Sequence, residues 1–211
     1  MRDRNAPLAG ADIAGLAWGK MDGLLPAAVQ DASSGRVLML GYMSHEALAA
    51  TLASGFVTFH SRSKGRLWQK GESSGNVLRV RAIHEDCDGD ALLVLADPEG
   101  PTCHLGTQSC FGGEGPQGPG WLAELSRVVA ARASAGGEGS YTRQLLDEGT
   151  AKIAQKVGEE GVEVALAAVT RNAAGCAEET ADLLYHLTVL MHDRGYGWDE
   201  VVAVLKARHA S

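Results

Sequence analysis

Short apolar runs separated by polar turns dominate the first half of this 211-residue chain. The runs are rich in Val, Leu, Phe and Ile and are bounded by Gly, Ser and Asp clusters, which is typical of β-strands. One segment differs, because Ser44 precedes apolar residues at helical spacing that stop at Gly55. The pattern predicts a β-rich α+β domain with one helix. Its predicted strands cover residues 36–40, 56–60, 77–83 and 91–96.

The second half shows helical periodicity and no convincing strand. Ser140 and Gly149 are a cap and a stop signal, and Gly195 and Gly197 mark a further turn. We therefore expect an all-α helical bundle. Because a bundle of about 90 residues has only a small core, we expect a second copy to complete it. The predicted helices cover residues 121–133, 141–148, 151–170, 177–194 and 198–207.

A segment rich in glycine and proline separates the two patterns. Residues 112–120 read GGEGPQGPG, and neither a helix nor a strand persists through such a sequence. We predict a first domain at 18–111, a linker at 112–119 and a second domain at 120–211. We expect residues 1–17 to be poorly ordered.

The composition of the chain limits which kinds of partner, such as nucleic acids, membranes or metal ions, it is expected to bind. The formal net charge of −7 argues against a nucleic-acid-binding surface, because phosphate backbones require clustered Lys and Arg. No apolar run is long enough to cross a bilayer or to form a signal-peptide core, so we expect a soluble, cytoplasmic protein without membrane contact. Four cysteines are few for a disulfide-stapled domain, and in a reducing compartment a cluster of them favours metal binding.

Acidic residues alternate along residues 86–90, which read DCDGD and directly precede a predicted strand. In an extended chain alternate side chains share a face, so Asp86, Asp88 and Asp90 should converge while Cys87 points away. Three converging carboxylates suit a hard cation such as Mg²⁺. A solvated acidic turn is the alternative. A calcium-binding loop is excluded, because it needs Gly where Ala91 stands and flanking helices.

Soft ligands follow in the loop CHLGTQSC of residues 103–110. With Cys87, the thiols of Cys103 and Cys110 make a three-sulfur set, and three protein ligands on Zn²⁺ leave a fourth position for an activated water. Since strand alternation turns Cys87 away from the aspartates, we expect a zinc site shared between two chains, with Cys87 from one and the other two cysteines from its partner. Buried reduced cysteines are the alternative.

A polar segment after the second predicted strand is dense in hydroxyls, cations and glycines. Such groups, together with exposed backbone N–H groups, are what a phosphate or a ribose needs. A solvated hairpin is the alternative, and the sequence carries no Walker-type or dinucleotide-binding glycine pattern. The candidate substrate-binding residues of this segment are Ser61, Arg62, Ser63, Lys64, Trp68, Lys70, Ser74 and Asn76.

Two predicted helices carry matching acidic patterns, EEGVE at 159–163 and EETAD at 178–182. Each set lies within an arc of about 100° on one side of its helix. A solvated acidic face is the alternative, but like charges one turn apart cost roughly 0.2–0.5 kcal/mol per pair. Mg²⁺ would remove that cost, and Lys152 and Lys156 stand where they could meet phosphates. The candidate magnesium ligands are Glu159, Glu160, Glu163, Glu179 and Asp182.

The first half contains, in order, the motifs MLGYM (39–43), SRS (61–63), LW (67–68), KGE (70–72), SGN (74–76), DCD (86–88), GP (100–101), CH (103–104) and SCF (109–111). Over about residues 19–111 it resembles phosphoribosyl-AMP cyclohydrolase, an enzyme of histidine biosynthesis. Two positions, His60 and Leu105, depart from the expected pattern, and neither is an implied ligand. The resemblance implies Mg²⁺ on the three aspartates, Zn²⁺ on the three cysteines, and a homodimer. It also implies that water adds at C6 of the adenine ring and the N1–C6 bond opens. His104 is then a candidate for proton transfer, or for orienting a ligand.

The second half contains GSYT (139–142), KVGEE (156–160), EV (163–164), EETADLLYHL (178–187) and RH (208–209). Over about residues 121–209 it resembles phosphoribosyl-ATP pyrophosphatase, an all-α member of the MazG-like nucleotide pyrophosphohydrolases. The resemblance implies that pyrophosphate is released beside Mg²⁺, with Glu160 and Glu163 as catalytic carboxylates. The product, phosphoribosyl-AMP, is the substrate implied for the first half. We therefore expect two successive steps on phosphoribosyl nucleotides in one chain.

Two other functions fit the same residues. One is a general nucleotide pyrophosphohydrolase with a metal-binding N-terminal module, which would act on ordinary nucleoside triphosphates. The other is a non-catalytic metal-binding scaffold, which would be expected to have lost ligands, whereas all the candidate ligands are present.

Overall fold

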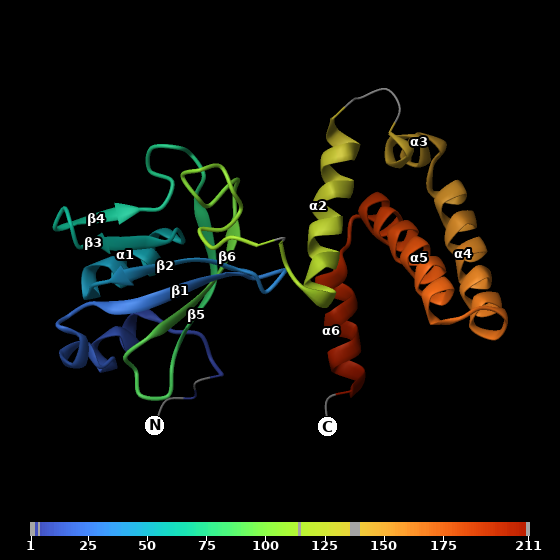
Figure 1. Cartoon of the computed structure of the whole chain (residues 1–211). Coiled ribbons are helices and arrows are strands. Elements are labelled where there is room, and N and C mark those ends of the chain that lie inside the picture. The colour runs from blue at the N-terminus through green and yellow to red at the C-terminus, as the bar shows by residue number, and fades with distance from the viewer. Residues whose placement is uncertain (1–2, 4, 114, 136–139, 210–211) are drawn as a thin grey trace. The chain divides into compact units, whose positions relative to one another are not determined.

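The structure is a computed structural model that describes residues 3, 5–113, 115–135 and 140–209 (Figure 1). It divides the chain into two compact units, Met1–Gly120 and Trp121–Ser211. The division falls at the end of the Gly- and Pro-rich segment, so this segment lies within the first unit. A hydrogen bond from the Arg36 side chain to the carbonyl of Gly113, at 3.4 Å, contributes to holding it there.

A four-stranded sheet in the order β2-β1-β6-β5 forms the centre of the first unit. The β1 and β6 strands run parallel, and the other neighbours pair antiparallel. A two-stranded sheet joins β3 and β4, and α1 (His45–Ser54) lies between β2 and β3 in the sequence. The strands are β1 (Leu25–Asp31), β2 (Val37–Met43), β3 (Thr58–Ser61), β4 (Arg66–Gln69), β5 (Leu78–Glu85) and β6 (Leu92–Pro98).

The predicted helix of the first half is confirmed together with its signals. The Ser44 side chain accepts a hydrogen bond from the backbone N–H of Ala47 at 3.2 Å, and the helix ends at Gly55. This cap satisfies one of the N–H groups that a helix start leaves without a partner. The four predicted strands are present as β2, β3, β5 and β6, with ends shifted by one to three residues.

Two strands, β1 and β4, were not predicted from the sequence. In β1 the buried side chains alternate, with Leu25, Ala27 and Val29 fully buried, but Pro26 and two alanines weaken its strand signal. The short β4 strand lacks a buried residue and is recognisable only through its pairing with β3. The central position of β1 therefore depends on its neighbours β2 and β6 rather than on strong local propensity.

The prediction that residues 1–17 are poorly ordered is wrong for the described part of this segment. Leu8, Ile13 and Leu16 are each about 95% buried and join the core of the first unit. Two short 3₁₀ helices, η1 (Gly10–Gly15) and η2 (Trp18–Met21), carry the chain across it. The Trp18 indole donates a hydrogen bond to the carbonyl of Ile13 at 2.8 Å. Apolar burial therefore orders a segment that its position at the chain terminus had suggested would be poorly ordered.

Replacing Ile13 by alanine is expected to lower the free energy of unfolding by about 2–5 kcal/mol, the usual cost of truncating a buried aliphatic side chain. Urea denaturation followed by tryptophan fluorescence measures the change. The exposed neighbour Ala14 supplies the control, since Ala14→Ser should change stability by less than about 0.5 kcal/mol. Equal stability of the two variants would show that the N-terminal segment does not belong to the core.

The second unit is all-helical, as predicted, and the fold class of the chain is confirmed: a β-rich α+β half followed by an α-helical half. The α5 helix begins earlier than predicted, because the Asn172 side chain caps it by accepting from the N–H of Gly175. Among the described residues of this unit, the buried apolar cluster consists of Val129, Leu145, Ile153 and Val189. The helices are α2 (Trp121–Ser134), α3 (Tyr141–Glu148), α4 (Thr150–Thr170), α5 (Ala173–Arg194) and α6 (Trp198–His209).

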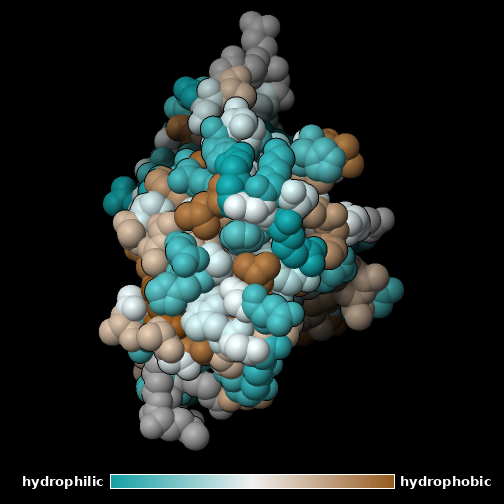
Figure 2. All heavy atoms as spheres, turned by 90° about the vertical axis from the view of Figure 1, so that its left-hand side faces the viewer, coloured by the Kyte–Doolittle hydropathy of each residue, from teal (hydrophilic) through white to brown (hydrophobic). Residues whose placement is uncertain are grey.

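The surface of the described residues carries polar and apolar side chains side by side. On the face drawn in Figure 2, hydrophobic residues are scattered among hydrophilic and neutral ones. Within the described ranges, no helix combines the length and the apolar character that crossing a membrane requires.

Candidate active sites

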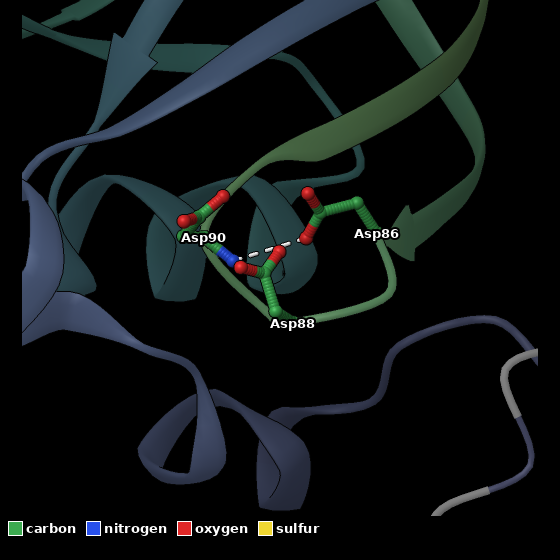
Figure 3. A group of neighbouring side chains, drawn as sticks. All are labelled: Asp86, Asp88 and Asp90. Carbon is green, nitrogen blue, oxygen red and sulfur yellow. Dashed lines mark hydrogen bonds between the residues drawn. The ribbon is translucent and has the colours of Figure 1, made fainter.

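The three aspartates of the DCDGD segment come together in the first unit (Figure 3). Carboxylate oxygens of Asp86, Asp88 and Asp90 all lie within 4.8 Å of one another. The predicted extended conformation is wrong here, because the segment is a turn between β5 and β6. Gly89 adopts a φ of 72°, which favours glycine. Asp86 closes the turn by accepting from the backbone N–H of Asp90 at 3.0 Å.

Lys20, from η2, supplies a positive charge to this group. Its ammonium lies 2.6 Å from Asp88 and 3.5 Å from Asp90. The hydrogen bond from Lys20 holds the pKa of Asp88 below its ordinary value. Sequence reasoning missed Lys20, because it lies in the segment just after the one expected to be disordered. Oxygen-only donors from one turn match the preference of Mg²⁺, so these residues fit the cation that the sequence suggested.

The cysteine loop is fastened to β2. The Ser109 hydroxyl donates to the carbonyl of Val37 at 2.8 Å, and the N–H of Cys110 donates to the carbonyl of Leu38 at 2.7 Å. The thiols of Cys103 and Cys110 are close enough to interact directly. Hydrogen bonding from the backbone of Leu105 lowers the pKa of Cys103, which favours the thiolate that binds metals.

Cys87 lies apart from this pair. It is exposed in the aspartate turn, and among the described residues no metal-ligating group unites it with Cys103 and Cys110. Two thiols of one chain thus leave a zinc ion short of the three protein ligands that an open site uses.

A pocket of about 470 Å³ opens beside the cysteine pair. It brings together most of the predicted residues of the polar segment and the cysteine loop. Thr102, which the sequence did not single out, also lines it, and its buried hydroxyl has no hydrogen-bond partner among the described residues. The predicted residues in its wall are Trp68, Lys70, Ser74, Asn76, Cys103, His104 and Cys110.

Lys70, which the sequence predicted as a residue that binds phosphate or ribose, is not a solvated cation. It is buried, and its ammonium donates to the carbonyl of Asn76 at 3.0 Å. Burial lowers the pKa of Lys70, and the nearby thiols of Cys110 and Cys103 act in the opposite direction. The loop from Lys70 to Asn76 is tight, because a Cβ on Gly71 would collide with the backbone of Asn76. Lys70 therefore joins the two ends of this loop in the pocket wall and places a positive charge near the thiols.

A second pocket of about 250 Å³ shares Trp68 with the first. Ser61 and Lys64 line it, as a phosphate-binding role requires. Arg62 does not line either pocket, because its guanidinium stacks 3.9 Å above the ring of Tyr42. Ser63 is also outside both linings and lies 3.4 Å from Ser61, oxygen to oxygen.

Carboxylates of two helices meet in the second unit. Oxygens of Glu160 on α4 and of Glu179 and Asp182 on α5 lie within 4.8 Å of one another. Glu163 contacts this group, and the charges of Glu160 and Glu179 raise its pKa. The Glu160 side chain is buried, whereas Asp182 is exposed. A group of acids whose mutual repulsion raises a pKa is one that a divalent cation would stabilise.

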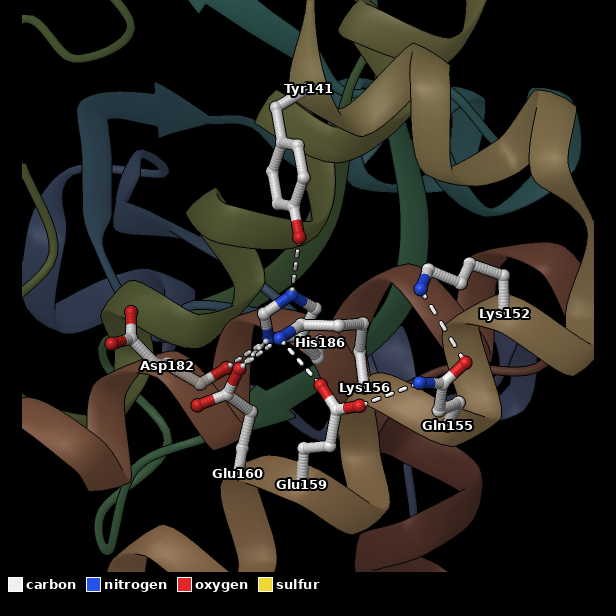
Figure 4. Close-up of polar contacts among 8 residues, drawn as sticks. All are labelled: Tyr141, Lys152, Gln155, Lys156, Glu159, Glu160, Asp182 and His186. Atoms are coloured by element: carbon white, nitrogen blue, oxygen red, sulfur yellow. Dashed lines mark hydrogen bonds and ion pairs between the residues drawn. The ribbon is translucent and has the colours of Figure 1, made fainter.

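Glu159 does not join this group, although the sequence placed it among the ligands. It projects about 100° around α4 from Glu160, its neighbour in the chain. Its carboxylate instead accepts from Gln155 at 2.6 Å and from Lys156 at 2.8 Å (Figure 4). Lys156 also lies 3.2 Å from Glu160, and its two carboxylate partners raise its pKa. Lys152 contacts Gln155 at 3.4 Å, one turn further from the acids.

Two residues of the second unit were not predicted as site residues. His186 is buried beside Glu160, with Nδ1 3.5 Å from the Glu160 carboxylate. The Tyr141 hydroxyl lies 3.2 Å from the other ring nitrogen. A signal was available in the sequence, because His186 follows Glu179 by seven residues and Asp182 by four and so shares their face of α5.

Comparisons with known proteins assign a family to each half. The family model for phosphoribosyl-AMP cyclohydrolase matches residues 39–112, and that for phosphoribosyl-ATP pyrophosphohydrolase matches residues 122–209. The chain is 58% identical to the Histidine biosynthesis bifunctional protein HisIE of Xanthomonas campestris pv. campestris, over 95% of this chain and 96% of the relative. It is 56% identical to the protein of that name from Escherichia coli K12, over 92% and 95%. Against the Vibrio vulnificus CMCP6 protein the identity is 52%, over 94% and 97%.

Proposed function

Because the chain belongs to the family of bifunctional histidine-biosynthesis proteins, with a phosphoribosyl-AMP cyclohydrolase half and a phosphoribosyl-ATP pyrophosphohydrolase half, we propose that each half works through the metal-ligand group of its own unit. The chain catalyses two successive hydrolyses. The second half converts phosphoribosyl-ATP to phosphoribosyl-AMP and pyrophosphate, and the first half opens the adenine ring of that product at the N1–C6 bond. A general pyrophosphohydrolase and a non-catalytic scaffold do not account for both matches.

The observation that carries the proposal is the convergence of three carboxylates in each unit. In the first unit Asp86, Asp88 and Asp90 would hold Mg²⁺, and Cys87 of one chain with Cys103 and Cys110 of its partner would hold Zn²⁺. In the second unit, the group of Glu160, Glu179 and Asp182, with Glu163 beside it, would hold Mg²⁺. Zinc supplies Lewis-acid activation of water, and magnesium offsets phosphate charge.

In the first unit, we assign substrate binding to the two adjoining pockets. Trp68 lies in both linings, so its ring can stack against the base. Ser61 and Lys64 offer a hydroxyl and an ammonium to a phosphate in the smaller pocket. His104 lines the larger pocket, with Nδ1 3.9 Å from the Cys103 sulfur. It is therefore placed to move a proton at the ring or to orient the cysteine ligand.

In the second unit, we assign proton removal from the attacking water to Glu163. Its carboxylate is exposed at the edge of the group, and the neighbouring charges of Glu160 and Glu179 raise its pKa and so its basicity. Lys156 and Lys152, on the same helix, would bind phosphate oxygens. Lys156 can do so only by exchanging part of its present pairing with Glu159 and Glu160.

We propose a homodimer acting in the cytoplasm. In the second unit, Val162, Leu166 and Val169 form an exposed apolar stripe on α4, at 60%, 56% and 81% exposure. They recur every three or four residues, so they share one face of the helix. The small core of this unit supports a second copy as the occupant of that face. A cytoplasmic location is consistent with the free cysteines of the described structure.

Incubating the full chain with phosphoribosyl-ATP, Mg²⁺ and Zn²⁺ is expected to yield pyrophosphate first and the ring-opened product afterwards. Pyrophosphate is followed by a coupled phosphate assay and ring opening by ultraviolet absorbance. Ordinary nucleoside triphosphates are the comparison substrates and should release pyrophosphate far more slowly. Equal rates on ATP would favour the general pyrophosphohydrolase instead.

A further inference from the structure

We propose that His186 is a positioning residue of the second unit, which holds the Glu160 carboxylate in the group it forms with Glu179 and Asp182. The proposal rests on the function proposed above, because it concerns the carboxylates assigned there to magnesium. It also gives a role to Tyr141 of the GSYT motif, which the assignment of ligands left without one.

The His186 ring is held at both nitrogen atoms (Figure 4). Its Nδ1 lies 2.9 Å from the backbone carbonyl oxygen of Asp182 and 3.5 Å from the carboxylate of Glu160. Its Nε2 lies 3.2 Å from the hydroxyl of Tyr141, which stands at the start of α3. The ring therefore connects three elements, α3, α4 and α5, at the place where the carboxylates meet.

The neighbours of the ring determine where its proton lies. A carbonyl oxygen and a carboxylate only accept hydrogen bonds, so Nδ1 must carry the hydrogen that faces Asp182 and Glu160. In the neutral ring Nε2 then accepts, and the Tyr141 hydroxyl donates to it. The rings of Tyr141 and Tyr185 pack edge-on against the imidazole, with centroids 6.0 and 5.1 Å away. These contacts leave the imidazole little freedom to rotate.

Glu160 needs such a fixed donor. Its side chain is buried among other acids, and a buried carboxylate is stable only when donors face it. Lys156, 3.2 Å away, is one donor, but it is shared with Glu159 and sits on a flexible side chain. The His186 ring is rigid and belongs to the same helix as Glu179 and Asp182. The Glu160 oxygen that faces Nδ1 at 3.5 Å is the one that faces Lys156 at 3.2 Å, so the ring keeps this oxygen beside α5 while it also faces Lys156.

The test uses Mn²⁺ as a spectroscopic probe for the magnesium site. The parent is the full chain with Asp88→Asn and Asp90→Asn, which removes competing binding by the first unit. Mn²⁺ titration followed by electron paramagnetic resonance is expected to show affinity about 10–100-fold weaker for His186→Leu, the usual effect of removing a group that orients a ligand. His186→Asn keeps an N–H donor near the Nδ1 position and should stay within about threefold of the parent. Circular dichroism checks that each variant is folded.

Tyr141→Phe tests the same contact from its other side, because Tyr141 is half-exposed and its hydroxyl faces His186. It removes one hydroxyl without opening a cavity, and it should weaken Mn²⁺ binding by about three- to tenfold, as expected for the net loss of one hydrogen bond. If His186→Leu does not fold, the Tyr141→Phe variant by itself still tests the proposal. In the otherwise unaltered chain, excess Mg²⁺ should restore the rate of pyrophosphate release to each folded variant, because the metal's affinity rather than the chemistry is impaired.

Three outcomes overturn the inference. Folded His186→Leu and Tyr141→Phe variants that bind Mn²⁺ like the parent show that the contact does not position Glu160. Equal losses in His186→Leu and His186→Asn show that the ring only fills space. A parent that binds no Mn²⁺ removes the proposed metal site itself, and the inference with it.

Discussion

Replacing Glu160 by glutamine is expected to lower the rate of pyrophosphate release at least about 100-fold, the equivalent of roughly 3 kcal/mol of lost metal stabilisation. The amide occupies the same volume but removes the charge at the buried centre of the group with Glu179 and Asp182. Ring opening of supplied phosphoribosyl-AMP should be unchanged, because that reaction belongs to the other unit. Both rates are measured on one preparation, and circular dichroism checks that the helices of the substituted unit are folded.

The adjacent residue Glu159 is the matched control. Glu159→Gln makes the same chemical change on the same helix, but its carboxylate faces Lys156 and Gln155 outside the group. It should cost less than about threefold, because exposed ion pairs contribute little. Glu163→Gln should resemble Glu160→Gln, since Glu163 contacts both Glu160 and Glu179. A Glu159 variant as impaired as the Glu160 variant, or equal loss of both activities, would contradict the assignment of the site.

Co-expression of Cys87→Ser and Cys103→Ser chains is expected to restore ring opening to about a quarter of full activity, although each variant alone is inactive. In a mixed dimer one shared site carries both lesions and the other carries neither. Half of the dimers are mixed under random pairing, and half of their sites are intact. The separation of Cys87 from the interacting pair of Cys103 and Cys110 motivates the prediction.

The pair Cys103→Ser with Cys110→Ser is the control for this complementation. If these two cysteines act from the same chain, every site of their mixed dimer contains one lesion, so no activity should return. Affinity tags of two kinds establish that mixed dimers form. Background activity in proven Cys87→Ser/Cys103→Ser dimers would mean that one chain holds all three ligands, and recovery in the control pair would mean that Cys103 and Cys110 act apart.

Local patterns determined much of the fold. The helix after Ser44 and the five helices of the second half follow from caps, stop signals and apolar spacing, each of which acts within a few residues. The strand β1 was not predictable in this way, because its alanines and Pro26 favour no strand, and pairing with β2 and β6 supplies what propensity lacks. The N-terminal segment was misjudged for a similar reason, since the burial of Leu8, Ile13 and Leu16 is a tertiary effect.

The sequence by itself determined the family, the order of the two halves and the residue types of both sites, because these lie in contiguous motifs of fixed spacing. Only the tertiary structure decided which carboxylates face one another. Glu159 and Glu160 are neighbours in the chain, yet the helical turn sends one to Lys156 and the other into the group on α5. Lys20 meets Asp88 across 68 positions of sequence, and Tyr141 meets His186 across 45. The sequence contains no periodic pattern that would predict such pairs, because the packing of separate elements brings them together.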